Sequence, residues 1–444
     1  MRKEHTSKHS IVKPPLLDIN KLVTANIGVY AYVNEMHGEM LNLSIVTEEL
    51  LAYDKKMLTK ENYTHYKPYF CEFFCDALQN KGAKYLANKY TGKWVKVKFK
   101  NCADVSGYFD IKGFLLISMS PFKKVNMKIE YNYEELDADR IKTINDTYKI
   151  DHDSILLKNE TDENYIKLRD ELNLHSLGIN YKIRIYNVGQ GNCIYLRSSK
   201  KGEQTRRILF DIGMTIRKDI DLDEIQARIK SLSRIKPDIM ILSHWDVDHL
   251  LGVYLVDEKS YAEVWLAPDY QERRMNQSIS RLAKYLCLYK KLYLIGDYFK
   301  GKLVYNSEYM QIYKGKIKGK GYNKPNQIAN NHGLILLLEN NHGVDILPGD
   351  CEYDMWPDII WEQINGRINM VVPHHCANMV TKAMSDICQR VQPNNAIISV
   401  GDNTYGHPNE QHRCDLYNMG YSVSETRNTK WIDISNSCME TFYE

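Results

Sequence analysis

After about residue 175 the sequence contains a series of short apolar runs that end in turn residues. The runs are IRIYNV (183–188), RILFDIG (207–213), DIMILS (238–243), GLILLL (333–338), VDILPGD (344–350), INMVVP (368–373) and NAIISVG (395–401). Such runs are typical of buried β-strands. Helical candidates lie between several of them: DLDEIQARIKSLSRI (221–235), NQSISRLAKYLCLYKKLYLI (276–295) and TKAMSDICQRV (381–391). This alternation predicts a β-rich, layered α/β domain.

The first 175 residues have a different pattern. The segments 46–58 and 65–90 carry apolar residues at three- and four-residue spacing, which predicts helices. Three β-rich runs follow: KWVKVKFK (93–100), FLLISMS (114–120) and VNMKIEYNY (125–133). The polar stretch 137–165 has weak periodicity and predicts a linker. Because 444 residues exceed the roughly 250 to 300 of a single core, we expect a smaller α+β domain over 1–175 and a second domain over 176–444.

Composition narrows the class of protein. Lysine and arginine number 59 against 56 acidic residues, so bulk charge does not predict nucleic-acid binding, and any basic surface must be local. We find neither the apolar core of a signal peptide nor a stretch long enough to cross a membrane. The ten cysteines are scattered, which favours reduced thiols rather than a disulfide framework. We therefore expect a cytoplasmic protein with no membrane association.

The densest group of ionisable residues directly follows the run DIMILS. It reads His244-Trp245-Asp246-Val247-Asp248-His249. In a tightly turning segment, His244 and Asp246 can face one ion while Asp248 and His249 face another. Imidazole and carboxylate groups are ligands for zinc, manganese or iron. A helix cap with surface charge is the simpler alternative, but four such groups after a buried strand favour a two-metal centre.

Further candidate ligands lie where later runs end. They are Asp350 in LPGD, His374 and His375 in VVPHH, and His407 in YGHP. A metal centre at one edge of a sheet needs ligands from several strand ends, and this distribution offers them. His332, in NNHGLILLL, is a candidate ligand with a loop histidine as the alternative.

The order and spacing of several motifs resemble a known family. The motifs are VGQGN (188–192), LFDIG (209–213), LSHWDVDH (242–249), LPGD (347–350), VPHH (372–375) and SVGDNTYGHP (399–408). Over about residues 181–435 they resemble the metallo-β-lactamase fold, specifically the branch with the soluble hydrolase domain of ComEC-type DNA-uptake competence proteins. The resemblance implies an αββα sandwich with a metal site at the sheet edge and with nuclease or phosphodiesterase activity.

The resemblance also implies roles for individual residues. His244 and Asp246 correspond to ligands of a first metal, Asp248 and His249 to ligands of a second, and Asp350 to a bridging carboxylate. Either of the paired histidines, His374 or His375, would complete the second site or act as a proton donor. The extra oxygen ligand shifts the preference toward harder ions such as manganese, while zinc stays open.

Some positions concern the surroundings of the ligands. Asp211 resembles an aspartate that orients a ligand or a loop, and a turn-forming aspartate is the alternative. Asn187 stands where the branch usually has an aspartate, and it brings no charge with which to orient a ligand histidine. Cys376 and Ala377 stand where the branch usually has glycine and serine. These departures bear on substrate and activity rather than on the fold.

The predicted chemistry follows from the ions. A divalent metal lowers the pKa of bound water from 15.7 to roughly 7, which supplies hydroxide at neutral pH. Negative charge then develops on phosphodiester oxygens, which two cations and a protonated histidine can stabilise. Asp248, His375 and His407 are the predicted catalytic residues, the two histidines as proton donors or phosphate contacts.

A lysine- and tyrosine-rich segment, 299–324, precedes the run GLILLL. Within it Lys314, Lys316, Lys318 and Lys320 can neutralise phosphates and nearby tyrosines can stack on bases. A solvated hairpin or loop is the alternative for such a segment.

The sequence as a whole predicts a metal-dependent hydrolase of phosphodiester bonds with nucleic acid as the leading substrate. In this prediction the amino-terminal domain supplies recognition or contacts a partner protein. Two rivals stay open: a phosphodiesterase of a small cyclic or modified nucleotide, and a binding or scaffold subunit with a silent metal centre.

Overall fold

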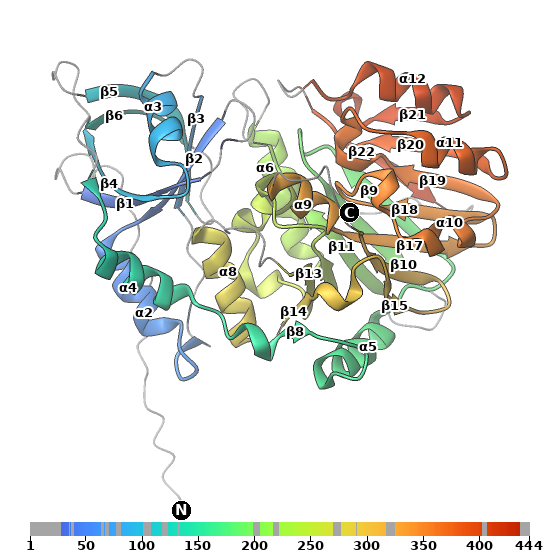
Figure 1. Ribbon diagram of the computed structural model, residues 1–444, viewed down its shortest axis with the longest axis horizontal. Coiled ribbons are helices and arrows are strands. Elements are labelled where there is room, and N and C mark those ends of the chain that lie inside the picture. Colours follow the sequence, from blue (N-terminus) through green and yellow to red (C-terminus); the bar gives the residue numbers. More distant parts are fainter. Residues whose placement is uncertain are drawn as a thin grey trace, which may run out of the picture. The chain divides into compact units, whose positions relative to one another are not determined.

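The computed structural model divides the chain into two compact units. The first consists of Met1–Ser118, Lys123–Ile150 and Asn276–Tyr289, and the second of the remainder. The structure describes residues 28–34, 36, 40–63, 66, 71–76, 81–100, 108–117, 123–130, 134–198, 205–215, 222–269, 277–289, 291–316, 325–401 and 406–435. The first unit thus includes a segment from far along the chain, which is the yellow helix α8 (Gln277–Leu288) in Figure 1.

The first unit is built on a closed ring of six antiparallel strands. In order around the ring they are β1 (Gly28–Val33), β2 (Met40–Val46), β3 (Cys71–Asp76), β5 (Tyr108–Ile117), β6 (Lys123–Glu130) and β4 (Trp94–Lys100), and β4 pairs back with β1. A short β7 (Glu134–Glu135) pairs with β4, and the helices are α2 (Glu48–Met57), α3 (Lys81–Tyr90), α4 (Ala138–Tyr148) and α8. Alternate residues such as Val29, Ala31 and Val33 are fully buried. Closure satisfies the backbone groups that an open sheet leaves at its edges.

Two predictions for this unit are wrong. Residues 71–76, expected within a helix, form β3, because pairing with β2 and β5 outweighs the helical spacing of the apolar residues and buries both faces of the strand. The stretch 137–165, expected as a linker, contains α4, which Asp137 caps and which buries Ile144 and Tyr148. The helix predicted over 46–58 is confirmed by α2.

A buried polar network joins α8 to the rest of the first unit. The guanidinium of Arg281 in α8 donates to Asp54, 2.7 Å away, and to the hydroxyl of Tyr148. Tyr66 and Tyr148 donate their hydroxyl protons to the two oxygens of Asp54. Removing one member of such a buried ion pair leaves the partner charge uncompensated, which costs about 3 to 5 kcal/mol. The network therefore holds α8 in this unit.

The second unit is a sandwich of two sheets. The first has the strand order β22 (Trp431–Ser435), β9 (Tyr181–Tyr186), β10 (Cys193–Ser198), β11 (Arg206–Ile212), β12 (Ile239–Ile241), β13 (Val264–Pro268), β14 (Leu292–Ile295) and β8 (Leu156–Leu157). The second runs β15 (Leu303–Asn306), β16 (Met310–Lys314), β17 (Leu334–Asn340), β18 (Gly343–Leu347), β19 (Arg367–Val371), β20 (Gln392–Ile398) and β21 (Ser422–Glu425). One apolar cluster draws residues from both, including Phe210 and Leu336. All seven apolar runs are confirmed as strands.

Helices complete the layers of this unit. Buried side chains of α10 (Asp358–Gln363), α11 (Lys382–Cys388) and α12 (Glu410–Asn418) pack in a second apolar cluster against the second sheet, and Figure 1 shows these helices on its outer side. The 3-10 helix η4 (Leu251–Leu255) lies beside β11, and the helix α6 (Leu222–Ser231) packs against η4. The result is the layered α/β arrangement that the alternation of runs and helices predicts.

The units divide the chain at Ile150 rather than near residue 175. Leu156 and Leu157 pair with β14, and Leu168 and Leu172 of α5 (Glu163–His175) belong to the core of the sandwich. The helix predicted over 276–295 ends with α8, and the residues after it form β14, since parallel pairing with β13 takes them into the sheet.

Two further expectations concern cysteines and membranes. The eight cysteines in the described ranges are all free, as their spacing predicts. None of the helices in those ranges has the length and apolarity that crossing a bilayer requires.

A buried carboxyl group of the first unit, that of Glu72 in β3, predicts a pH dependence of stability. Burial raises the pKa of the Glu72 carboxyl to about 7, although the Ser44 hydroxyl donates to it. The folded state therefore holds this proton up to a higher pH than the unfolded chain does, and its contribution to stability is lost between about pH 4.5 and pH 7. The loss should amount to roughly 3 kcal/mol. Glu72→Gln should remove this pH dependence. In urea unfolding, the free energy of unfolding of the variant should therefore rise relative to that of the natural protein as the pH increases from about 4.5 to about 7.

The exposed Glu49 of α2 provides the matched control. Glu49→Gln should leave the pH profile of the unfolding free energy unchanged. A constant difference between Glu72→Gln and the natural protein from pH 4.5 to 7 contradicts the assignment.

Candidate metal centre

The site lies where strands of both sheets end. The strand β12 is followed by Ser243 and His244, and Asp246 then begins the short helix α7 (Val247–Leu250), whose first turn carries Asp248 and His249. From the second sheet, Asp350 follows β18 and the pair His374 and His375 follows β19. Parallel neighbouring strands bring their carboxyl ends to one edge, and ligand groups from distant parts of the chain meet there.

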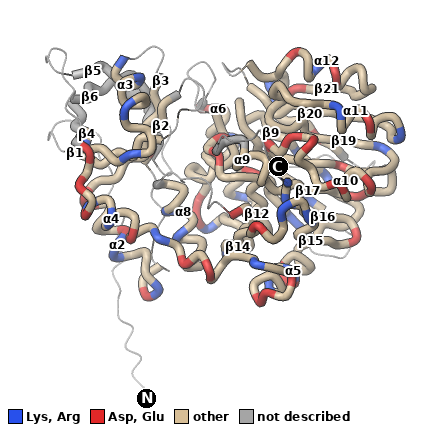
Figure 2. The backbone as a smooth tube through the Cα atoms, viewed as in Figure 1, with Lys and Arg blue, Asp and Glu red and all other residues tan. Residues whose placement is uncertain are grey.

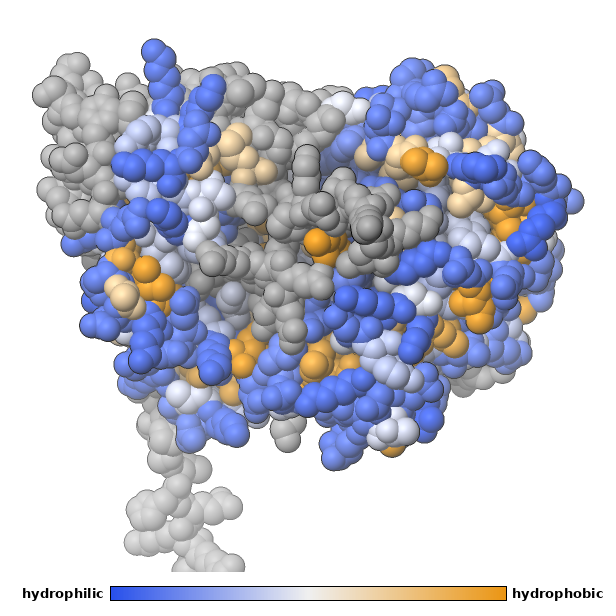
Figure 3. Space-filling view, in the orientation of Figure 1, coloured by the Kyte–Doolittle hydropathy of each residue, from blue (hydrophilic) through white to orange (hydrophobic). Residues whose placement is uncertain are grey.

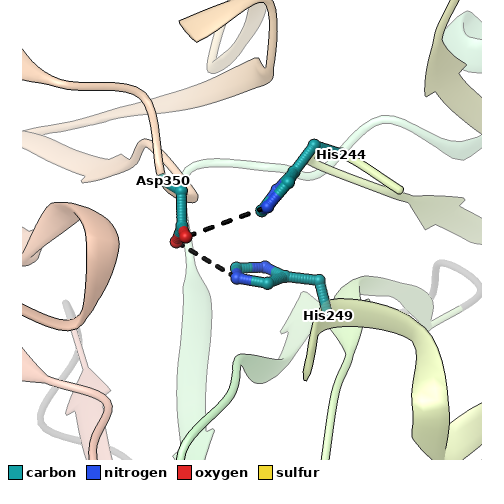
Figure 4. Close-up of side chains that lie close together, drawn as sticks. All are labelled: His244, His249 and Asp350. Atoms are coloured by element: carbon teal, nitrogen blue, oxygen red, sulfur yellow. Dashed lines mark ion pairs between the residues drawn. The ribbon is translucent and has the colours of Figure 1, made fainter. Parts of the chain in front are cut away.

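Asp350 occupies the centre of the group. Its Oδ1 lies 3.1 Å from His249 Nε2 and 3.7 Å from His375 Nε2. Its Oδ2 lies 3.8 Å from His244 Nε2 and 3.7 Å from His374 Nε2. Figure 4 shows the His244 and His249 rings pointing toward this carboxylate. Each oxygen thus faces a different pair of imidazoles.

The two remaining carboxylates lie on opposite flanks. Asp246 Oδ2 is 3.7 Å from His244 Nε2, and Asp248 Oδ2 is 3.5 Å from His375 Nε2. Within the described residues, two groups have donor atoms close enough to share an ion. They are His244, His249 and Asp350, and Asp248, His249 and His375. The structure therefore brings Asp350 and the pair His374 and His375 together with the ionisable residues of the segment 244–249 (the hexad), which are His244, Asp246, Asp248 and His249.

Hydrogen bonds set the tautomers of the three buried histidines. Nδ1 of His375 lies 2.7 Å from the Ser399 carbonyl oxygen, which can only accept, so Nδ1 carries the proton. Nδ1 of His249 lies 2.7 Å from Asp211. The hydroxyl of Ser243 donates to Asp211, which leaves it to accept from Nδ1 of His244. In their neutral forms all three rings therefore carry the proton on Nδ1 and have Nε2 free to bind a metal ion.

The atoms that face the centre lack other partners. Within the described residues Nε2 of His244, His249 and His375 and Oδ1 of Asp350 are buried and form no hydrogen bond. Buried polar atoms almost always have a partner, so four such atoms that face one another without a hydrogen bond suit the binding of a cation between them. Imidazole nitrogens and carboxylate oxygens are ligands of zinc and manganese. This donor set fits divalent cations.

Electrostatics agree with this fit. Burial opposes ionisation of Asp350, but His249, His374 and His375 hold its pKa well below the usual range. Burial likewise disfavours a charged His249, but Asp350 and Asp211 raise its pKa well above the usual range. Burial and the charge of His249 lower the pKa of His244 to about 4. Asp350 therefore stays ionised and attracts positive charge to the centre.

The backbone around the ligands adopts uncommon conformations. His374, His375 and Cys376 have φ values of 50°, 52° and 64°, and Asp211 has 59°. Non-glycine residues held in sparsely populated regions cost about 1 to 3 kcal/mol each and persist only where surrounding contacts enforce them. Here the His374 amide donates to Gly349 and the Asn409 amide to Cys376. The strain is concentrated at the segments that carry or orient ligands.

Two glycines permit a close backbone approach at Asp248. A Cβ at Gly213 would overlap the Asp248 carbonyl oxygen, and one at Gly191 would crowd the same atom. The backbone of the motifs LFDIG and VGQGN therefore packs directly against the Asp248–His249 turn.

Other predicted residues lie around this centre or away from it. The ring of His407 lies 5.6 Å from that of His374. Asn187 donates to the Thr429 carbonyl and accepts from the Gly189 amide, so it shapes a loop rather than contacting a ligand histidine. The structure does not bring His332 into either ligand group. Instead, burial and the ammonium groups of Lys314 and Lys300 lower its pKa to about 3.

The four lysines predicted to bind nucleic acid differ in their surroundings. Lys314 is fully buried, and its ammonium donates to the Ile295 carbonyl, because β16 runs inside the second sheet. This prediction is therefore wrong, since a buried ammonium cannot reach a phosphate. Lys316 forms an ion pair with Asp358. Lys318 and Lys320 lie outside the described residues.

The comparison with known families bears on the same segment. The profile of the Metallo-beta-lactamase superfamily matches residues 186–286. These residues form a metallo-β-lactamase superfamily domain. The match contains Asp211 and residues 244–249, while Asp350 and the pair His374 and His375 of the candidate metal centre lie beyond it. No curated protein matches the chain.

The superfamily indicates a metal-dependent hydrolase. The narrower resemblance to DNA-uptake competence proteins stays a prediction. Two residues that support the candidate metal centre, Ser243 and Ser399, were not predicted from the sequence. Ser243 stands within the quoted motif LSHWDVDH, so its position beside His244 was a usable signal. Ser399 contributes a main-chain carbonyl, which every residue carries, so its identity gave no signal.

The close approach at Asp248 yields a test. Gly213→Ala should displace the Asp248–His249 turn, lower the free energy of unfolding by about 1 to 3 kcal/mol and reduce the bound zinc. Urea unfolding and elemental analysis of purified protein measure both effects. In Gly178→Ala the added Cβ meets no atom within 4 Å, so both quantities should stay close to those of the natural protein. Equal behaviour of the two variants contradicts this account of the turn.

Proposed function

We propose that the second unit hydrolyses phosphodiester bonds and holds two divalent cations, zinc or manganese, around Asp350. The observation that carries the proposal is the position of this carboxylate, whose two oxygens face different pairs of imidazoles. A carboxylate with this surrounding suits a bridge between two ions. The superfamily match supports the metal-dependent hydrolytic chemistry.

The proposed ligands divide between the two oxygens of Asp350. His244 and Asp246 stand on the Oδ2 side, and Asp248, His249 and His375 on the Oδ1 side. Divalent cations bound there would lower the pKa of water to supply hydroxide at neutral pH and would stabilise negative charge on phosphodiester oxygens.

The histidine pair takes separate roles in this proposal. His375 is fully buried and its Nδ1 proton is engaged by Ser399, which suits a ligand. His374 has a side chain 31% exposed and lies beside His407. We assign proton donation to the leaving oxygen, or contact with the phosphate, to His374 and His407, which can reach a substrate from solvent.

Nucleic acid is the leading substrate in the proposal. Two divalent ions held by the proposed ligands would supply charge stabilisation for the attacking and leaving oxygens of a displacement at phosphorus. Figure 3 shows mainly hydrophilic residues on the coloured part of the second unit, which suits a polar substrate. Figure 2 shows basic and acidic residues interspersed along α11 and α12, so phosphate contacts must come from local groups such as Lys316, Lys318 and Lys320.

The proposed role of the first unit is recognition of the substrate or of a partner protein. The helix α8, which connects β13 to β14 of the hydrolase sheet, belongs to that unit. A helix of the proposed recognition unit therefore lies in the chain between two strands of the proposed hydrolase unit.

Asn187 and Cys376, the departures from the branch that favour a silent scaffold, do not contribute to the candidate metal centre. Asn187 contacts the Thr429 carbonyl and the Gly189 amide, and the Cys376 thiol lies toward the Asn409 carbonyl. Neither side chain is part of the cluster, so neither substitution removes a donor atom from it.

The test combines metal analysis with hydrolysis. The purified protein should contain two ions per chain and should cleave linear DNA, RNA or a cyclic nucleotide, with the preferred substrate separating a nuclease from a small-nucleotide phosphodiesterase. Asp350→Asn should lower the cleavage rate by more than about 100-fold, since even partners behind the ligands cost 10- to 100-fold. Chelation should abolish cleavage, and added zinc or manganese should restore it.

The control is Asp386→Asn, which removes an exposed carboxylate paired with Lys382 and should leave the rate unchanged. Metal-loaded protein that cleaves none of the three substrates refutes the proposed activity and supports the scaffold.

A further inference from the structure

A buried bridge of hydrogen bonds connects the two ligand-bearing segments of the second sheet. At its centre is His412 of α12, which is 1% exposed. Nδ1 of His412 lies 2.8 Å from the Ala377 carbonyl oxygen, and Nε2 lies 3.1 Å from the Tyr353 hydroxyl. Ala377 follows His375 by two residues and Tyr353 follows Asp350 by three. One imidazole therefore spans the segments after β18 and after β19.

The chemistry of the partners fixes how the bridge is built. The Ala377 carbonyl only accepts, so Nδ1 of His412 carries the proton, and Nε2 accepts from the Tyr353 hydroxyl. Burial lowers the pKa of His412, which favours this neutral form. Tyr353 belongs to the apolar cluster that also contains Trp356, Met370 and Leu416, and Ala377 is buried. In such surroundings neither hydrogen bond competes with bulk water, so the bridge is rigid.

The turn that the bridge holds needs such support. Residues 374–376 are three successive non-glycine residues with positive φ. The start of α12 holds this turn twice, through His412 at Ala377 and through the Asn409 amide at Cys376. The side chain of Asn409 in turn accepts from the His412 amide.

We propose that His412 is a positioning residue for the metal centre, one that fixes the spacing between Asp350 and His375. It touches neither an ion nor a substrate, and it acts through the Tyr353 hydroxyl and the Ala377 carbonyl. This inference rests on the proposed function only in that the cluster holds divalent cations. It adds that the affinity for these ions depends on a side chain buried behind the ligands.

The experiment measures zinc affinity rather than hydrolysis. The full-length chain and its variants are stripped of metal and titrated with zinc against a chromophoric chelator. His412→Leu should raise the Kd by 10- to 100-fold, the range found when partners behind metal ligands are removed. His412→Asn places an amide N–H where Nδ1 stands, so it keeps the bond to Ala377 but loses the bond to Tyr353, and it should raise the Kd only severalfold.

Two further variants keep the test decisive. Tyr353→Phe removes only a hydroxyl and should raise the Kd severalfold even where His412→Leu fails to fold. Leu416→Ala, in the same helix and the same apolar cluster, lowers stability without touching the bridge and should leave the Kd unchanged. The visible spectrum of the cobalt-loaded protein should change in His412→Leu and not in Leu416→Ala.

The outcomes separate this inference from the proposed activity. A folded His412→Leu protein with natural zinc affinity overturns the inference, as does a natural protein that binds no divalent ion. Protein that binds zinc and follows the predicted order of affinities but cleaves no phosphodiester refutes the activity alone.

Discussion

The central physical constraint in the second unit is the burial of several carboxylates and imidazoles in one small volume. Asp350, Asp248 and Asp246 lie among four histidines. Nε2 of His244, His249 and His375 and Oδ1 of Asp350 form no hydrogen bond within the described chain. Buried charge is tolerated only where opposite charge and hydrogen bonds compensate it. Divalent cations would provide that compensation, and the tautomers set by Asp211, Ser243 and Ser399 leave the Nε2 lone pairs of the neutral rings free to bind them.

The packed sheets of the sandwich hold these carboxylates and imidazoles in position. Ligands come from one strand end in the first sheet and two in the second, and the core between the sheets fixes their separation. Glycines at 191 and 213 allow backbone segments to approach more closely than any side chain would permit. The strained turn at 374–376 shows that ligand geometry outweighs local backbone preference at this edge.

Much of the second unit could be predicted from the sequence, because apolar runs and turn residues are local signals. The hexad, Asp350 and the histidine pair followed from their positions after such runs. The closed ring of the first unit could not be predicted, since β3 carries a helix-like spacing and is a strand only through pairing with β2 and β5. The burial of Lys314 and the isolation of His332 from the ligands depend on packing between distant segments, which spacing along the chain does not reveal.

The membership of α8 in the first unit has a consequence for how the chain can be divided. The polypeptide leaves the first unit after residue 150, forms the strands β8 to β13 of one sheet, returns to the first unit through α8 and leaves it again. No single cut therefore releases an intact hydrolase domain. A fragment that begins after Ile150 would retain Arg281 without Asp54, a cation deprived of its counterion on a helix deprived of its neighbours.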